Sequence, residues 1–109
     1  MLTDQEIIVR ATEAANVAGA SWLAQAQSWR SRGYVCGNAH VQFKDKRSSV
    51  YKRFQREGLV RSSGNGVVKI NHDYLPRQEY GLRTACAEAA LQSLEHDGIV
   101  GLRVWSYID

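Results

Sequence analysis

Apolar residues at helical spacing predict a helix near the start of the chain. They lie three or four positions apart, at Ile7, Ala11, Ala14 and Ala18. Thr3 and Glu6 in front of them match a capping box, in which each side chain accepts a hydrogen bond from the other residue's backbone N–H. Gly19 is a candidate break and Ser21 a candidate cap. The pattern therefore leaves open whether one bent helix or two helices follow.

The next apolar residues also have helical spacing. They are Trp22, Leu23, Ala26 and Trp29. Arg30 and Arg32 favour the C-terminal end of such a helix, and Gly33 suits the left-handed residue that closes it. Trp22 and Trp29 are seven positions apart and share one helix face. We expect them to fill the core or to pair two copies of the chain in a homodimer.

Residues 39–43, which follow a turn signal, fit two structures. They form a short helix if Asn38 caps it. They form a strand if the alternation of Ala39, Val41 and Phe43 with polar residues decides the local structure. This choice determines the fold, because a helix here would stand directly before the most basic segment of the chain.

Two further helices are predicted. Ser48 or Ser49 can cap the first, and Gly58 ends it. Its apolar side consists of Val50, Tyr51 and Phe54. Pro76 suits the first turn of the second helix. The apolar stripe of that helix consists of Leu82, Cys86, Ala89, Ala90 and Leu94.

Three segments are predicted to be strands. Residues 59–62 and 67–70 form a hairpin around Asn65 and Gly66, because both of these residue types tolerate the positive φ that a tight hairpin needs. Residues 99–108 are rich in β-branched and aromatic residues and form a terminal strand.

The composition adds limits to this picture. The chain has 109 residues, of which 44% are hydrophobic and 23% charged, as in one globular domain. We expect residues 1–109 to form a single α+β domain, mostly helical, with a β-hairpin. No signal-peptide pattern and no run of 18 apolar residues is present, so we expect no membrane contact and a cytoplasmic location. Cys36 and Cys86 are then expected to be reduced, mostly buried thiols.

The net charge of +3 conceals a basic centre. Residues 1–29 carry −2, residues 30–61 carry +7 and residues 62–109 carry −2. The basic residues of the central segment are Arg30, Arg32, Lys44, Lys46, Arg47, Lys52, Arg53, Arg56 and Arg61. A local cluster of this kind favours nucleic-acid binding, because each neutralised phosphate releases counterions. The alternative is a solvated helix that happens to be basic.

The basic residues lie around the predicted helix that Ser48 or Ser49 caps. The N-terminus of a helix also offers free N–H groups and a positive dipole end to a phosphate. The residues expected to face nucleic acid are Lys46, Arg47, Ser49, Lys52, Arg53 and Arg56, with Arg61 and Lys69 on the hairpin.

The segment RSSVYKRFQREGLV (47–60) resembles the recognition helix of winged helix-turn-helix DNA-binding domains. Such helices commonly begin at Ser or Thr, carry Val and an aromatic residue, and end in Glu-Gly-Leu-Val before the wing. The resemblance extends over residues 38–70 at most. It implies a winged-helix-like fold whose wing tip, residues 64–66, is flanked by Arg61 and Lys69 at the DNA backbone or minor groove.

The chain departs from this family before the basic helix. The family's turn usually holds Gly between apolar residues, whereas residues 44–47 contain neither, and a helix over 39–43 would be unusually short. If 39–43 is a strand, the helix-turn-helix is lost. A small α+β domain then remains, with an antiparallel sheet made of 34–43, the hairpin and 99–108. Its basic helix could still bind nucleic acid or a protein.

No residue pattern indicates an enzyme, because nucleophile-elbow, Walker and zincin patterns are lacking. We therefore expect no catalytic residue and no cofactor. The candidate zinc ligands are Cys36, His40, His72 and Cys86. No second close pair follows Cys36 and His40, so no metal site is expected. A platform for stacking single strands is not expected either, because Trp22, Trp29 and Trp105 lie outside the basic segment.

The sequence thus predicts a small non-enzymatic protein that binds double-stranded DNA as a transcriptional regulator of bacterial or phage type. The alternative is a small phage-type inhibitor or adaptor whose basic surface docks on a host protein complex. Binding to DNA at low salt distinguishes the two.

Overall fold

The computed structural model describes residues 2–25, 35–61 and 65–108. Three helices and a three-stranded antiparallel sheet make up these residues, which confirms the α+β class. The elements are α1 (Asp4–Gln25), β1 (Gly37–Phe43), α2 (Ser49–Arg56), β2 (Val67–Val68), α3 (Tyr80–His96) and β3 (Leu102–Ile108). Trp29, Arg30, Arg32, Gly33 and the hairpin residues 62–64 lie outside the described residues.

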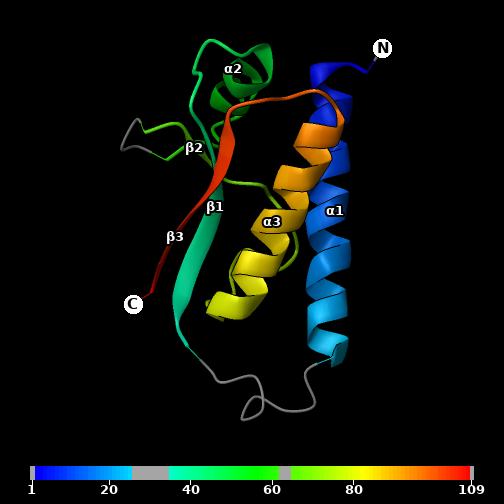
Figure 1. Cartoon of the computed structure of the whole chain (residues 1–109), viewed down its shortest axis with the longest axis vertical. Coiled ribbons are helices and arrows are strands. Elements are labelled where there is room, and N and C mark those ends of the chain that lie inside the picture. Colours follow the sequence, from blue (N-terminus) through cyan, green and yellow to red (C-terminus); the bar gives the residue numbers. More distant parts are fainter. Residues whose placement is uncertain (1, 26–34, 62–64, 109) are drawn as a thin grey trace.

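The elements form three layers (Figure 1). The strands make an antiparallel sheet in the order β2-β1-β3. One face of this sheet packs against α3, and α1 packs along α3 on the far side from the sheet. The short α2 lies at one end of the molecule, beside the start of α1 and the end of β1. The opposite face of the sheet, which we call the outer face, has no helix against it in Figure 1.

Residues 39–43 belong to β1, so the helix of a helix-turn-helix does not form there. Ala39, Val41 and Phe43 alternate onto the α3 side and are buried. Val41 lies opposite Val104 of β3. A spacing of two places all three apolar residues on the core face of a strand, which a short helix could not do. The predicted alternative, an antiparallel sheet made of the 34–43 segment, the hairpin and the terminal strand, is the architecture observed.

The hairpin joins this sheet through its second arm. Arg61 N–H donates to the Val67 carbonyl over 3.0 Å, and Lys69 N–H donates to the Leu59 carbonyl over 2.8 Å. Gly66 has φ +80° and its carbonyl accepts a 2.8 Å hydrogen bond from Phe43 N–H. The turn therefore ties the end of β1 directly to the hairpin.

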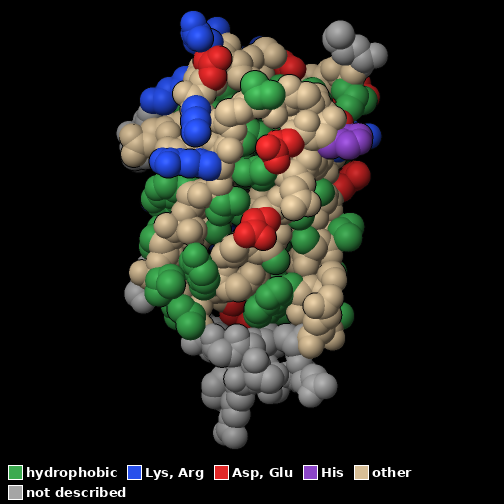
Figure 2. All heavy atoms as spheres, viewed as in Figure 1, with side chains coloured by type: hydrophobic (Ala, Val, Ile, Leu, Met, Phe, Trp, Pro, Cys, Tyr) green, Lys and Arg blue, Asp and Glu red, His purple; other side chains and the backbone are tan. Residues whose placement is uncertain are grey.

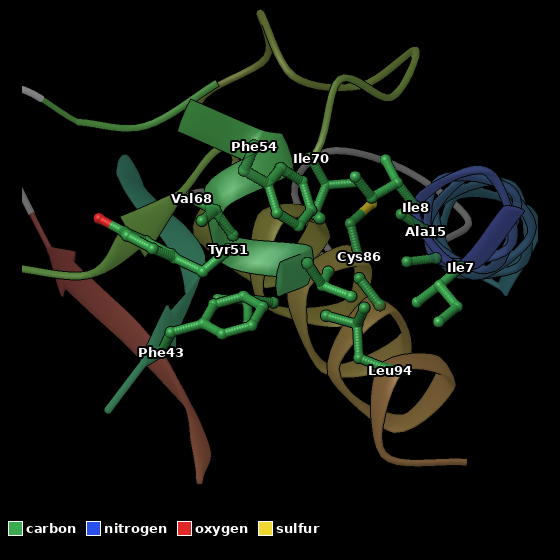
Figure 3. Close-up of a cluster of buried hydrophobic side chains, with 14 of the residues drawn as sticks. Ile7, Ile8, Ala15, Phe43, Tyr51, Phe54, Val68, Ile70, Cys86 and Leu94 are labelled. Atoms are coloured by element: carbon green, nitrogen blue, oxygen red, sulfur yellow. The ribbon is translucent and has the colours of Figure 1, made fainter. Parts of the chain in front are cut away.

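The core lies between α1, α3, the sheet and α2 (Figure 3). Phe43 connects the last two of these elements. Its ring centroid is 5.5 Å from that of Tyr51 and 6.0 Å from that of Phe54. These aromatic contacts fix the buried face of α2 against the end of the sheet.

α1 is a single helix that continues through Gly19 and Ser21, so neither the predicted break nor the predicted cap exists. Gly19 instead permits close packing, because a Cβ there would overlap the Tyr74 ring and lie 3.0 Å from the Cys86 sulfur. Trp22, from the same helix, packs against the core beside Gly81, where a Cβ would lie 2.7 Å from the indole.

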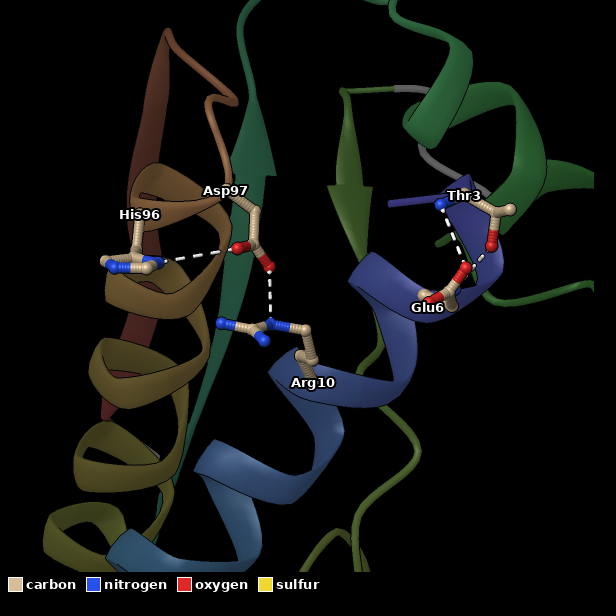
Figure 4. A network of polar contacts seen from close by, with 5 residues as sticks. All are labelled: Thr3, Glu6, Arg10, His96 and Asp97. Atoms are coloured by element: carbon tan, nitrogen blue, oxygen red, sulfur yellow. Dashed lines mark hydrogen bonds and ion pairs between the residues drawn. The ribbon is translucent and has the colours of Figure 1, made fainter. Parts of the chain in front are cut away.

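The capping box at the start of α1 is confirmed (Figure 4). Glu6 N–H donates to Thr3 Oγ1 over 3.1 Å, and Thr3 N–H donates to Glu6 Oε1 over 3.2 Å. Further along the helix, Arg10 forms a 3.0 Å ion pair with Asp97 at the end of α3. These contacts anchor both helices at the same end of the molecule as α2.

α3 begins at Tyr80 and not near Pro76, which lies in a turn. The buried guanidinium of Arg83 explains this. It donates to the carbonyls of Leu75 and Arg77 and, over 3.4 Å, to Ala39 of β1. It therefore holds the segment before α3 in a non-helical conformation. The predicted stripe is confirmed in its main members, Leu82, Cys86, Ala90 and Leu94, which are all buried.

Candidate nucleic-acid interface

The eight residues of α2 divide into a buried and a basic side. Val50, Tyr51 and Phe54 face the core. Lys52 and Arg56 are exposed and stand four positions apart, which places them on one side of the helix. The spacing of apolar residues that builds the core thus also forces these cations outward.

The N-terminus of α2 has a carboxylate of α1 beside it. Ser49 Oγ–H donates to Asp4 Oδ1 of α1 over 3.2 Å. Asp4 and Ser49 line a shallow hollow together with Lys52, Gln55 and Arg56. A carboxylate therefore occupies the position near the helix N-terminus where a phosphate was expected. Any phosphate at this hollow would lie toward Lys52 and Arg56.

Two other predicted cations have acidic neighbours. Arg47 Nε lies 3.1 Å from Asp45 Oδ1, although the Arg47 side chain is 90% exposed. Hydrogen bonds from the Arg47 backbone and side chain lower the pKa of the Asp45 carboxyl. Arg53 Nε lies 3.1 Å from Glu57 Oε1, one helical turn away. Exposed pairs of this kind stabilise little and can exchange for a phosphate.

Arg61 lies on the outer face of the sheet and not in a free wing. Its guanidinium carbon is 4.8 Å from the centroid of the Trp105 ring in β3. This cation–π contact joins the hairpin to the strand at the other edge of the sheet. Lys69 on the return arm is exposed.

Aromatic rings continue along the outer face from Trp105. His40 of β1 is stacked beside it, with ring centroids 6.1 Å apart and planes 20° from parallel. Tyr107, two residues further along β3, meets Trp105 edge to face at 5.1 Å. Burial, with smaller contributions from Arg83 and Arg61, lowers the pKa of His40 to about 4, so its ring is neutral at neutral pH. The row of rings on the outer face is therefore uncharged at His40, which is only 5% exposed, and Tyr107 is its most exposed member at 38%.

Polar side chains fix the same face nearer to α2. Gln42 of β1 donates to the Asn65 carbonyl of the hairpin over 2.7 Å, and its side-chain oxygen accepts a hydrogen bond from Arg103 of β3. Arg103, Trp105 and Tyr107 were not predicted as site residues. Their spacing of two along a predicted strand is the signal that could have placed them on one face.

Basic side chains gather at one end of the molecule (Figure 2). In this view they lie over α2 and the strands beside it, and hydrophobic side chains follow below them along the sheet. The loop before α2, α2 itself, the hairpin and β3 together carry nine cations. We call this set the basic end; it consists of Lys44, Lys46, Arg47, Lys52, Arg53, Arg56, Arg61, Lys69 and Arg103.

Other chemistry is limited in the described part of the chain. Among its residues, no group of three His, Cys, Asp or Glu side chains is placed to hold a metal ion. Cys36 and Cys86 are both free thiols, and burial raises the pKa of Cys86 to about 11, so it stays protonated at neutral pH. None of the helices described combines the length and the apolar character needed to span a bilayer.

Comparison of the chain with models of protein families, with curated proteins and with solved structures finds no match.

Proposed function

We propose that this protein binds DNA through its basic end. The observation that carries the proposal is the convergence of cations from four separate elements on one end of a small domain. Lys52 and Arg56 project from α2, while Arg61 and Arg103 lie on the neighbouring sheet. Such a cluster binds the phosphate backbone by releasing counterions, and it needs no helix-turn-helix.

The regulatory role is part of the same proposal. A regulator of bacterial or phage type would use the phosphate contacts to position itself and would read bases from the exposed polar side of α2. Gln55, between Lys52 and Arg56 on that side, has the amide chemistry for a base edge. Pairing of two copies, as in many DNA-binding domains, would supply a second contact surface.

Replacing Lys52 and Arg56 together with alanine should weaken binding to duplex DNA about tenfold or more at low salt. The plot of log affinity against log salt should lose about two units of slope, one for each phosphate contact removed. Fluorescence anisotropy with a labelled duplex of about 20 base pairs, between about 50 and 200 mM salt, measures both quantities.

A matched control removes the same net charge elsewhere. Ala20→Glu with Ala24→Glu places two carboxylates on exposed positions near the end of α1 that lies away from α2. This variant should retain most of the parent affinity. If both double variants weaken DNA binding equally, only the net charge matters, and the proposal that Lys52 and Arg56 form part of a specific interface is contradicted.

A protein partner is the second candidate, and the position of β3 favours it. The seven residues of β3 pair with β1 and form one edge of the described sheet. Ile108 near its end is 63% exposed. Such an edge can pair with a strand of another chain. A protein that binds neither duplex nor single-stranded DNA at low salt would favour this candidate over the first.

A further inference from the structure

The outer face of the sheet carries aromatic rings that the proposed phosphate contacts do not use. Trp105 and Tyr107 stand on the same side of β3, and Arg61 lies over the Trp105 ring. Tyr107 is 38% exposed. We propose that this face is a stacking surface for the unpaired bases of single-stranded DNA.

The rings are arranged so that more than one base can be held. Trp105 and Tyr107 are two residues apart along an extended strand, and their ring centroids are 5.1 Å apart. Their planes differ by 68°, so each ring offers its own direction of approach. A base can also stack on a guanidinium plane, so Arg61 extends the surface toward the hairpin. Every base has a π-face, and this mode of binding therefore tolerates any sequence.

The charges beside the rings suit a strand's backbone. Arg103 precedes Trp105 on the same side of β3, and Lys69 is exposed on the hairpin arm across the sheet. The Gln42 side-chain oxygen accepts a hydrogen bond from Arg103, and the Gln42 side-chain nitrogen donates to the Asn65 carbonyl. Gln42 therefore helps to fix the position of Arg103. The aromatic row thus ends in cations at the basic end, where phosphates would lie.

A duplex cannot use this surface, because its bases are stacked on each other and expose only their edges. The preferred ligand is therefore a single strand, or the unpaired part of a partly melted duplex. This inference rests on the proposed DNA binding and adds that the bound DNA is unpaired. It also reverses the expectation that Trp105 is remote from the basic residues, since the fold brings Arg61 of the basic segment onto its ring.

The test compares two substitutions of one residue. Trp105→Phe retains an aromatic face, whereas Trp105→Leu is apolar and has no aromatic face. With a labelled thymidine oligonucleotide of about 15 nucleotides, we expect Trp105→Leu to weaken binding about tenfold to a hundredfold. Trp105→Phe should stay within about threefold of the parent. Binding to a duplex of equal length should be unchanged in both.

The variant Arg61→Lys tests whether the planar guanidinium, and not only its charge, contributes to binding. Lysine keeps the positive charge but has no plane on which a base can stack. We expect weaker binding of the oligonucleotide with an unchanged salt slope. Tyr107→Leu, at a more exposed position, gives the same test if Trp105→Leu does not fold, as judged by its thermal unfolding curve.

The outcomes separate the two proposals. If the parent binds duplex DNA and the oligonucleotide equally, and Trp105→Leu affects neither, the stacking surface is wrong and the basic interface stands. If only the duplex binds, the stacking surface is also wrong. If an oligouridine RNA of the same length binds and the thymidine oligonucleotide does not, the ligand is RNA and the proposal is overturned. If no nucleic acid binds at low salt, both proposals fail.

Discussion

Replacing Gly66 with alanine should destabilise the folded protein by about 3–4 kcal/mol. Two causes act together. The residue has φ +80°, a conformation that costs an L-amino acid about 1–2 kcal/mol. An alanine Cβ would also overlap the Phe43 carbonyl oxygen, so the backbone must move apart and weaken the Phe43 N–H to Gly66 carbonyl hydrogen bond. Urea unfolding followed by circular dichroism measures the loss.

Gly58→Ala is the matched control. Gly58 has nearly the same backbone conformation, φ +71°, but no atom lies within 4 Å of its Cβ position. We expect it to cost only the strain of positive φ, about 1–2 kcal/mol. The difference between the two variants isolates the close approach of the hairpin turn to β1. Equal losses would show that the turn can move away from β1 without cost.

Local pattern was enough for several elements of the fold. The capping box at Thr3 and the apolar stripe from Leu82 to Leu94 were correctly predicted, because the information for each lies within a few helical turns. Residues 39–43 were left open because five residues can satisfy a helical and an extended pattern equally well. The pairing of Val41 with Val104, more than sixty residues away, decides the matter.

The errors in the predicted boundaries have one physical origin. Gly19 and Pro76 were interpreted from their local preferences, as a break and as a helix start. Gly19 is in fact required by the contact with Tyr74, and the turn at Pro76 is held by the guanidinium of Arg83. Both causes lie in tertiary packing. An arginine that is only 2% exposed within a helix stripe is not foreseen by any rule of periodicity.

The candidate site was predicted only in part, because part of it depends on contacts between residues far apart in the sequence. The cations of α2 lie within five positions of the sequence and could be found from it, and the ion pairs of Arg47 with Asp45 and of Arg53 with Glu57 are also local. The outer face depends on the β1–β3 register, which sets His40 opposite Trp105. Because Arg61 and Trp105 are distant in sequence, only the fold could reveal that they meet.

Acidification should destabilise this protein well above the pH at which its carboxylates are protonated. Burial, with Arg83 next in effect, lowers the pKa of both His40 and His72 from 6.5 to about 4. Arg61, Lys69 and His72 act on His40 in the same direction, while Asp73 acts on His72 in the opposite one. His72 Nδ1 also accepts the Tyr74 N–H over 3.2 Å, which requires that this nitrogen carry no proton.

The sign follows from proton binding in the two states. Between pH 6.5 and about pH 4 the unfolded chain binds protons that the folded protein does not, so the free energy of unfolding falls as the pH is lowered. The stabilisation from the two neutral imidazoles is complete above pH 6.5 and is lost as the pH falls toward about 4. We expect a decrease of about 2–3 kcal/mol for each imidazole across this window.

Urea unfolding at a series of pH values tests this account through variants that do not titrate. His40→Phe keeps a flat ring beside Trp105, and His72→Asn keeps an acceptor for the Tyr74 N–H. Combined, they should remove most of the slope between pH 6.5 and 4, while His96→Gln removes an exposed histidine as the matched control. A parent protein whose free energy of unfolding is constant across this window would show that both imidazoles accept protons in the folded state. In that case neither ring is shielded from water, and His40 could not supply the neutral, stacked ring that the outer face presents beside Trp105.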